Sequence, residues 1–420
     1  VANKTASVGQ SGGHVILLTF SAMFLSYLDR VVMSVTIIPM SLQYGWNDLQ
    51  KGAVLASFFI GYTLFQIPSG WIVNKFGGKL AMGVALAAWS LFTFLTPIGA
   101  SVSFVSLIIL RVLLGIGEAH ATPATYYLFA RWLATKERTR AVVMTMGGLP
   151  LGSMFGLLAA GWISGNFGWH MPFYLFGGIG FVMTIIWMFT IKDNPVHHPD
   201  VSLAQHEELS SDGAVVDDAK RQPIPWKKII SSPSVWVLIY NHFCCTWTLY
   251  VILAWLPSYF IKMHNMSISG AGITSAGPWL TLFVSSYIGA SIAEHLIKSG
   301  RSLTLVRKIM QITGLSGSAM CLLAIPYVSE TIPALMLFCG AIGFIGATWS
   351  GFACNHLDIA PKYAEVLVGI TNTAGSLPGI IGVSLTGLIL TLTDSYSVVF
   401  QISAAVSITG ALVWGVWATA

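Results

Sequence analysis

Long apolar runs separated by short polar loops dominate the chain. A membrane-spanning helix needs about 20 mostly apolar residues, and segments of that kind recur along almost the whole sequence. They predict helices at 15–40, 52–73, 80–100, 104–130, 140–163, 170–191, 233–261, 269–297, 304–327, 331–354, 362–391 and 396–419. The pattern therefore indicates an all-α membrane protein with twelve transmembrane helices.

One long polar stretch divides these helices six and six. Residues 192–230 are rich in acidic side chains and carry too few apolar residues to fold alone. We expect an N-terminal six-helix bundle at 1–191, a cytoplasmic linker at 192–230 and a C-terminal six-helix bundle at 231–420. Small residues four apart, Gly152 with Gly156 and Gly375 with Gly379, recur in corresponding segments of the halves and permit close helix packing.

Composition and charge agree with this interpretation. Only 9% of the residues are charged, against about a quarter in soluble proteins. Almost all basic residues outside the helices fall in the loops on one side, and the other side holds only Lys51 and Lys262. This bias predicts two cytoplasmic termini. The net charge of +5 is therefore explained by topology and indicates no nucleic-acid site. The five cysteines lack metal-ligand spacing, and no cofactor or metal is expected.

Four charged side chains lie inside predicted helices, where each costs roughly 2.5–3.5 kcal/mol and is a functional candidate. Asp29 and Arg30 adjoin in the first helix, and Arg111 and Glu118 lie seven residues apart in the fourth. We expect the four groups to line one water-filled cavity. Arg30 offers a permanent planar cation for a carboxylate or phosphate, although it could merely neutralise Asp29. Asp29 and Glu118 are candidate proton carriers, and Arg111 with Glu118 is alternatively a fixed structural ion pair.

Neutral polar and aromatic side chains on other helices are candidates for substrate selectivity, although each could equally be a packing residue. They are Tyr27, Tyr62, Gln66, Trp247, Tyr250, Trp349, Asn372 and Ser376.

Several motifs resemble the anion:cation symporter branch of the major facilitator superfamily, which includes vesicular glutamate transporters, sialin, plastid anion transporters and bacterial sugar-acid:proton symporters. They are Tyr27-Leu28-Asp29-Arg30, Gln66-Ile67-Pro68-Ser69-Gly70-Trp71, Arg111 with Gly115-Ile116-Gly117-Glu118, Arg131-Trp132 with Glu137-Arg138, Trp255-Leu256-Pro257, Asn355-His356-Leu357-Asp358-Ile359-Ala360-Pro361, and Gly369-Ile370-Thr371-Asn372-Thr373-Ala374-Gly375.

The resemblance implies a major facilitator fold, with Arg30 as the substrate anchor, Asp29 and Glu118 as proton carriers, and Tyr27, Tyr62, Trp349 and Asn372 at substrate-contacting positions. Gly70, Asn74 and Lys75 match the gating loop, in which Asn74 replaces the usual acid and should weaken closure. The glutamate transporters have an Arg where this chain has Thr246, which favours a monoanion bearing hydroxyl groups.

Together these features predict a secondary active transporter that imports an organic anion, such as a sugar acid, with protons. Sodium is the alternative coupling ion. Alternative functions are a passive facilitator or channel and a phosphate, glutamate or sialic acid transporter. A membrane enzyme is disfavoured, because no nucleophile–base or metal constellation is evident. We expect a monomer in contact with membrane lipid, in a bacterial inner membrane.

Overall fold

The computed structural model describes residues 10–133, 135–193, 225–360 and 363–419, and every regular element in those ranges is helical. The N-terminal half contains α1 (Gln10–Tyr44), α2 (Asp48–Phe76), α3 (Gly78–Val102), α4 (Phe104–Glu118), α5 (Ala121–Trp132), α6 (Thr135–Met146), α7 (Gly148–Phe167) and α8 (Met171–Thr190). The C-terminal half contains α10 (Trp226–Ser231), α11 (Pro233–His264), α12 (Ile268–Lys298), α13 (Leu303–Ala324), α14 (Thr331–Thr348), α15 (Cys354–Ile359), α16 (Ala364–Thr393) and α17 (Tyr396–Trp417).

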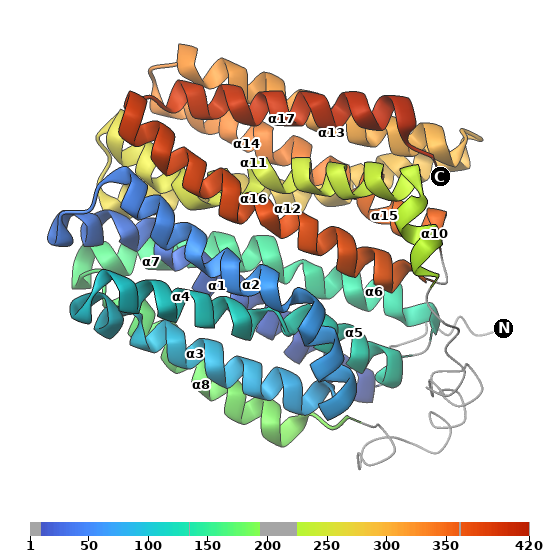
Figure 1. Ribbon diagram of the computed structural model, residues 1–420, viewed down its shortest axis with the longest axis horizontal. Helices are drawn as coiled ribbons and strands as arrows, with labels where there is room; N and C mark the ends of the chain where they lie inside the picture. Colours follow the sequence, from blue (N-terminus) through green and yellow to red (C-terminus); the bar gives the residue numbers. More distant parts are fainter. Residues whose placement is uncertain (1–9, 134, 194–224, 361–362, 420) are drawn as a thin grey trace.

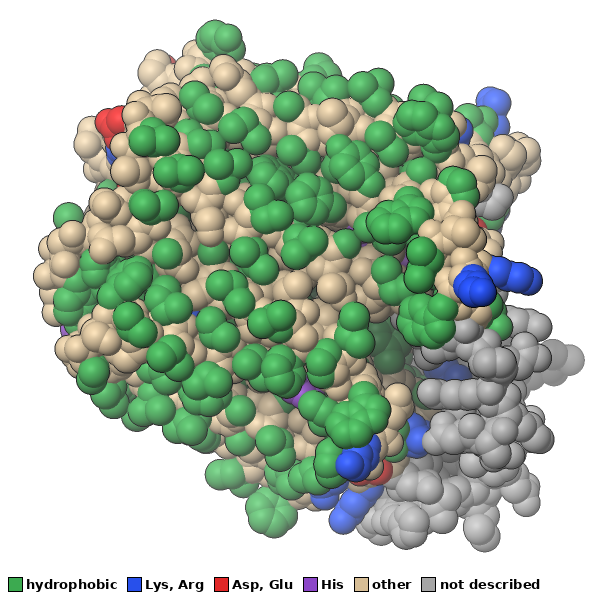
Figure 2. All heavy atoms as spheres, in the orientation of Figure 1, with side chains coloured by type: hydrophobic (Ala, Val, Ile, Leu, Met, Phe, Trp, Pro, Cys, Tyr) green, Lys and Arg blue, Asp and Glu red, His purple; other side chains and the backbone are tan. Residues whose placement is uncertain are grey.

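The helices form two bundles that lie side by side (Figure 1). Among the described residues, twelve helical segments are long and apolar enough to cross a membrane, which confirms the predicted fold. The C-terminus, α10 and the end of α8 lie at one end of the bundles (Figure 1). We call it the basic end, because Lys75, Lys79 and other Lys and Arg residues lie there. The flank seen in Figure 2 is covered with apolar side chains, as a lipid-facing surface requires.

Three predicted helices are interrupted. The predicted helix 104–130 divides into α4 and α5 around Ala119 and His120, and the predicted helix 140–163 divides into α6 and α7 at Gly147. The third, at 331–354, continues from α14 through one π-helical turn at Trp349–Ala353 into α15.

Side chains of α13 stabilise this π-helical turn. Gln311 Oε1 accepts the backbone N–H of Phe352 at 3.2 Å, and Arg307 Nη1 donates to Ser350 O at 2.8 Å. Backbone groups released by the wider turn are thereby satisfied.

Small residues bring the central helices together, as the four-residue spacing predicts. A Cβ at Gly152 would overlap the carbonyl oxygen of Phe24, and one at Gly156 would lie 3.0 Å from Leu28 Cα. These two glycines therefore let α7 pack directly on α1. Between the halves, Gly379 of α16 leaves room for the ring of Phe59 on α2. The middle of α1 is buried, because Asp29, Arg30 and Val31 are each at most 3% exposed.

The two halves meet closely at the end opposite the basic end. A Cβ at Gly161 of α7 would lie 2.9 Å from Gly272 Cα of α12. Helices α2 and α16 approach in the same way, because a Cβ at Gly52 would lie 3.2 Å from Gly387 Cα. These contacts close the opposite end of the structure.

An ion cluster of Asp48, Lys51, Lys262 and Asp394 adds to this closure, and we call it the opposite-end cluster. Asp48 pairs with Lys51 on α2, and Lys262 of α11 pairs with Asp394. Lys262 Nζ also lies 3.8 Å from Asp48 Oδ2 and so connects the halves. The hydrogen bond from Lys262 lowers the pKa of the Asp394 carboxyl.

The predicted linker is partly helical at its end, because α10 begins at Trp226. Ile229 of α10 is buried against Val235 of α11 and Leu367 of α16. Residues 194–224, which include most of the acidic side chains of the predicted linker, lie outside the described residues.

Candidate functional site

Arg30 lies at the midpoint of α1 with 3% of its surface exposed. Its guanidinium carbon lies 4.3 Å from the ring centre of Tyr27, 4.6 Å from that of Phe58 and 4.8 Å from that of Tyr62. Three aromatic faces thus hold the cation, and contacts of this kind are stronger where water is excluded. The guanidinium is positioned by packing before any ligand arrives.

Glu118, at the last residue of α4, is the ion-pair partner of Arg30. The distance from Arg30 Nη2 to Glu118 Oε2 is 2.7 Å, and Ser26 Oγ donates to the same oxygen at 2.8 Å. None of the described ion pairs joins Arg111 to Glu118, so the alternative of a fixed Arg111–Glu118 ion pair is not what this conformation shows. Among the described residues, the ion pair of Arg30 is with Glu118 and not with its neighbour Asp29. The seven-residue spacing placed Arg111 and Glu118 on one helix face but could not show that α1 supplies a nearer cation.

Several polar atoms of this charged cluster are buried without a hydrogen-bond partner among the described residues. They are Arg30 Nε and Nη1, Arg111 Nε and Nη1, Asp29 Oδ1 and Glu118 Oε1. Leaving buried polar atoms unpaired costs about 1–3 kcal/mol each, and more for charged groups. The cluster is therefore suited to receive a ligand, water or a proton.

A cavity of about 30 Å³ adjoins the ion pair. It is lined by Met23, Ser26, Tyr27, Arg30, Tyr62, Glu118, Ala121, Thr122, Met146 and Leu149. A space of this size admits about one water molecule, so an organic anion could enter only after the helices move apart. Asp29 and Arg111 do not line this cavity, which corrects the expectation that four charged groups share it.

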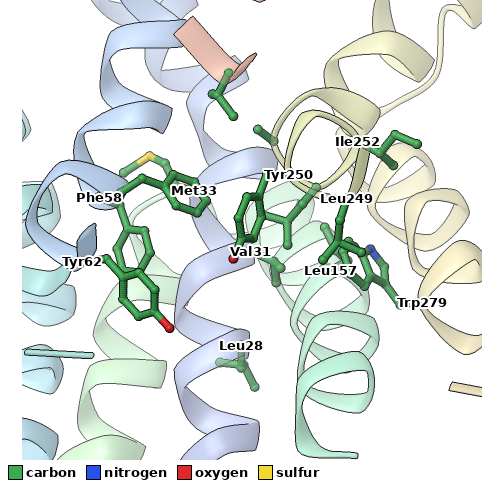
Figure 3. Packing of buried hydrophobic residues seen from close by; sticks show 14 of the residues in the cluster. Leu28, Val31, Met33, Phe58, Tyr62, Leu157, Leu249, Tyr250, Ile252 and Trp279 are labelled. Atoms are coloured by element: carbon green, nitrogen blue, oxygen red, sulfur yellow. The ribbon is translucent and has the colours of Figure 1, made fainter. Parts of the chain in front are cut away.

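Tyr250 brings the C-terminal half to the site. Its ring centre lies 4.5 Å from that of Phe59 on α2, and its hydroxyl lies near the Arg30 guanidinium. Figure 3 shows the hydroxyl groups of Tyr62 and Tyr250 approaching α1 from opposite sides. The predicted grouping of Arg30, Tyr27, Tyr62 and Tyr250 is thus present, with side chains from both halves.

Three other candidates form contacts between the halves. Asn372 of α16 donates to Gln66 of α2 at 3.0 Å. Thr63 Oγ1 donates to Ser376 Oγ at 2.8 Å. These three side chains therefore act as contacts between α2 and α16 in this conformation, and they would be released if the helices separated.

The two tryptophan candidates lie apart from the Arg30 cluster. Trp247 is buried in the C-terminal half, where its indole nitrogen donates to Ser403 at 3.2 Å. Trp349 is partly buried and begins the π-helical turn. Neither lines the cavity beside Glu118.

The loop after α2 lies at the basic end. Asn74 is exposed, and the Lys75 ammonium lies 4.9 Å from the Trp71 ring centre. Gly70 has open space around its α-carbon. These positions are far along α2 from Tyr62, which separates them from the ion pair.

Sequence reasoning missed two residues of the site. Phe58 lies between the two buried guanidinium groups, 4.6 Å from that of Arg30 and 5.5 Å from that of Arg111. Ser26 donates to Glu118. Helical spacing could have found both, because Phe58 lies one turn before Tyr62 and Ser26 one turn before Arg30.

The family model for the Major Facilitator Superfamily matches residues 19–383. The chain belongs to the major facilitator superfamily. It is therefore a multi-pass membrane transporter and not an enzyme.

Two solved structures of the fold superpose well. A bacterial homolog of the human lysosomal transporter Spinster, inward-facing and occupied, gives a TM-score of 0.76 at 17% identity, covering 96% of this chain and 95% of that one. A D-xylose-proton symporter gives a TM-score of 0.76 at 15% sequence identity, and the match covers 98% of each chain.

Curated relatives within the superfamily are similar over nearly the whole chain. The chloroplast ascorbate transporter of Arabidopsis thaliana is 37% identical over 408 residues, which cover 96% of this chain and 74% of that protein. The chloroplast sodium-dependent phosphate transport protein 1 of the same plant is 36% identical over 405 residues, covering 96% and 78%. The chain thus resembles plastid anion transporters, as its motifs indicate.

Proposed function

We propose that this superfamily member is a proton-coupled symporter of an organic anion that carries hydroxyl groups, such as a sugar acid. The observation that supports the proposal is the buried contact between Arg30 and Glu118, 2.7 Å long and surrounded by three aromatic rings. A fixed cation is already paired with a carboxylate of the protein, and a substrate carboxylate would need the same cation.

Competition for Arg30 provides the coupling. While Glu118 is ionised, it occupies Arg30 Nη2 and opposes the approach of a second anion. When a proton binds to a Glu118 oxygen, the carboxyl group becomes neutral and its attraction to the guanidinium falls. The substrate carboxylate then accepts hydrogen bonds from Nη2 and from Nη1, which has no partner in the described structure. After the anion leaves, the proton passes to water and Glu118 pairs with Arg30 again.

The surroundings of Arg30 favour a hydroxylated monoanion. Tyr27, Tyr62 and Tyr250 supply phenol groups near the guanidinium, and Gln66 and Asn372 supply amides that become available when α2 and α16 separate. The relative named as an ascorbate transporter supports this class. The relative named as a sodium-dependent phosphate transport protein supports a second candidate, phosphate import driven by sodium.

Uptake by purified protein in liposomes tests the proposal. Labelled gluconate, ascorbate, phosphate and glutamate are offered separately under an inward proton gradient, an inward sodium gradient and no gradient. We expect accumulation of a hydroxylated carboxylate under the proton gradient alone. Uptake that only equilibrates would indicate a passive facilitator, and accumulation of phosphate under the sodium gradient would select the second candidate.

Location, gating and oligomeric state also remain proposals. We propose a monomer in an energised membrane, specifically the bacterial inner membrane, because the coupling requires a maintained proton gradient. We further propose that Gly70, Asn74 and Lys75 act in gating, since they lie at the basic end and do not line the cavity.

A further inference from the structure

Ser26 has a hydrogen-bonding pattern that differs from that of other serines in the same helix. Its hydroxyl donates across to Glu118 Oε2 at 2.8 Å, and the side chain is buried. Ser34, two turns later and equally buried, donates to the carbonyl of Val31 in its own helix at 2.7 Å. A serine that served only to pack α1 would be satisfied as Ser34 is.

The hydrogen bond from Ser26 acts on one ionisation state of Glu118. Oε2 accepts from both Arg30 and Ser26, while Oε1 is buried without a hydrogen-bond partner in the described part of the chain. Hydrogen bonds donated to a carboxylate stabilise its charged form relative to its protonated form. In the protonated form Oε1 or Oε2 carries the hydrogen, and the hydroxyl contact loses its charge assistance. Ser26 therefore opposes protonation of Glu118.

The cavity places space for a proton acceptor beside Glu118. Helix α1 starts at the basic end, so Met23 and Ser26 lie on the basic-end side of Arg30. Helices α4 and α5 run toward that end, so Thr122 lies beyond Glu118 in the same direction. The cavity between them has room for about one water molecule, which could accept the proton from Glu118.

Resting on the proposed function, we infer that Ser26 is a positioning residue that sets the pH at which Glu118 releases its proton toward the basic end. The O–H bond of the protonated carboxyl breaks, the proton passes to water, and the carboxylate accepts from Ser26 and Arg30. Other ionisable groups around Glu118 are Tyr27 and Asp29 on α1, Tyr62 on α2 and Arg111 on its own helix. The side chains from α5, α6 and α7 that line the cavity are neutral.

Infrared titration of purified protein tests this inference without a substrate. A protonated carboxylic acid gives a C=O band, and the band that is absent from the spectrum of Glu118→Gln is assigned to Glu118. The intensity of this band is then followed as the pH rises. Removing one hydrogen bond to a charged group is expected to move the midpoint upward by about one pH unit in Ser26→Ala. Ser26→Thr keeps the hydroxyl and should restore the wild-type midpoint. Ser34→Ala is the matched control and should leave it unchanged.

An unchanged midpoint in Ser26→Ala, or a shift of equal size in Ser34→Ala, would overturn the inference. So would a Glu118 band that does not titrate. These outcomes are independent of transport, since a protein that moves no tested anion could still show the shift. Conversely, proton-driven uptake by the wild-type protein together with an unchanged Glu118 midpoint in Ser26→Ala would support the proposed function and exclude a role for Ser26 in it.

Discussion

Replacing Glu118 by Gln separates substrate binding from proton coupling. Glutamine keeps a carbonyl oxygen that can accept the hydrogen bonds from Arg30 and Ser26, but it cannot ionise. In the wild-type protein these hydrogen bonds are 2.7 and 2.8 Å long. A hydrogen bond to a charged acceptor contributes about 1.5–3 kcal/mol and one to a neutral acceptor about 0.5–1.5 kcal/mol, a difference of about 1–1.5 kcal/mol. If the substrate must displace the Glu118 carboxylate from Arg30, the variant should bind the anion roughly 5- to 12-fold more tightly at high pH. At low pH, where wild-type Glu118 is protonated, the affinities should converge.

The same variant should lose accumulation. A gradient of one pH unit corresponds to about 1.36 kcal/mol, so one proton can drive a monoanion to an approximately tenfold excess. In Glu118→Gln we expect the internal and external concentrations to become equal, while exchange of labelled for unlabelled anion continues. Accumulation and exchange are measured in the same proteoliposomes. Glu294→Gln, which changes an exposed acid paired with Lys298 at the basic end, is the matched control.

Proton-driven accumulation by Glu118→Gln would refute this reasoning. A structural role for Glu118 predicts a different result, because breaking a buried ion pair typically costs about 3–5 kcal/mol. The variant would then melt at a lower temperature and lose accumulation and exchange together.

Other variants test the anchor, the gate and the closure of the opposite end. Arg30→Lys keeps the charge but not the planar guanidinium, and calorimetry should show at least a tenfold loss of substrate affinity, about 1.4 kcal/mol. Substrate binding within twofold of wild type would show that Arg30 is not the substrate anchor. Asn74→Asp should restore a closing contact at the basic end and shift the population toward the form open at the opposite end, measured by spin-label distances; unchanged distances and transport would contradict a gating role. Gly161→Val should also favour the form open at the opposite end, because a Cβ at position 161 would lie 2.9 Å from Gly272 Cα. Cysteine labelling at the opposite end should then increase. Unaltered labelling would show that the contact between α7 and α12 tolerates a larger residue.

Helix number could be predicted from the sequence, because apolar length is a local property of the chain. The interruptions at His120, Gly147 and Trp349 could not. They depend on groups distant in sequence, such as Gln311, which satisfies the backbone N–H of Phe352 from another helix. Such contacts cannot be inferred from the length of an apolar segment alone.

Many of the residues around Arg30 could be predicted from the sequence, but which of them form pairs could not. Arg30 and Glu118 stood out because charges inside apolar segments are costly. Their contact joins residues 88 positions apart, and the rotation of α1 against α4 that creates it is set by packing, including the close approach of Gly156 to Leu28. The pairing of Gln66 with Asn372 likewise depends on how far the halves have closed.

Closure of the opposite end has a consequence for measured affinity. The glycine crossings and the opposite-end cluster all favour one conformation, although exposed ion pairs add only about 0–1 kcal/mol each. An anion arriving from that side binds only the fraction of molecules that have opened, and its apparent dissociation constant is the intrinsic constant divided by that fraction. If one molecule in about a hundred is open, an intrinsic value near 1 μM would be measured near 100 μM. Weak apparent binding from that side would then report a rare conformation and not a poor site.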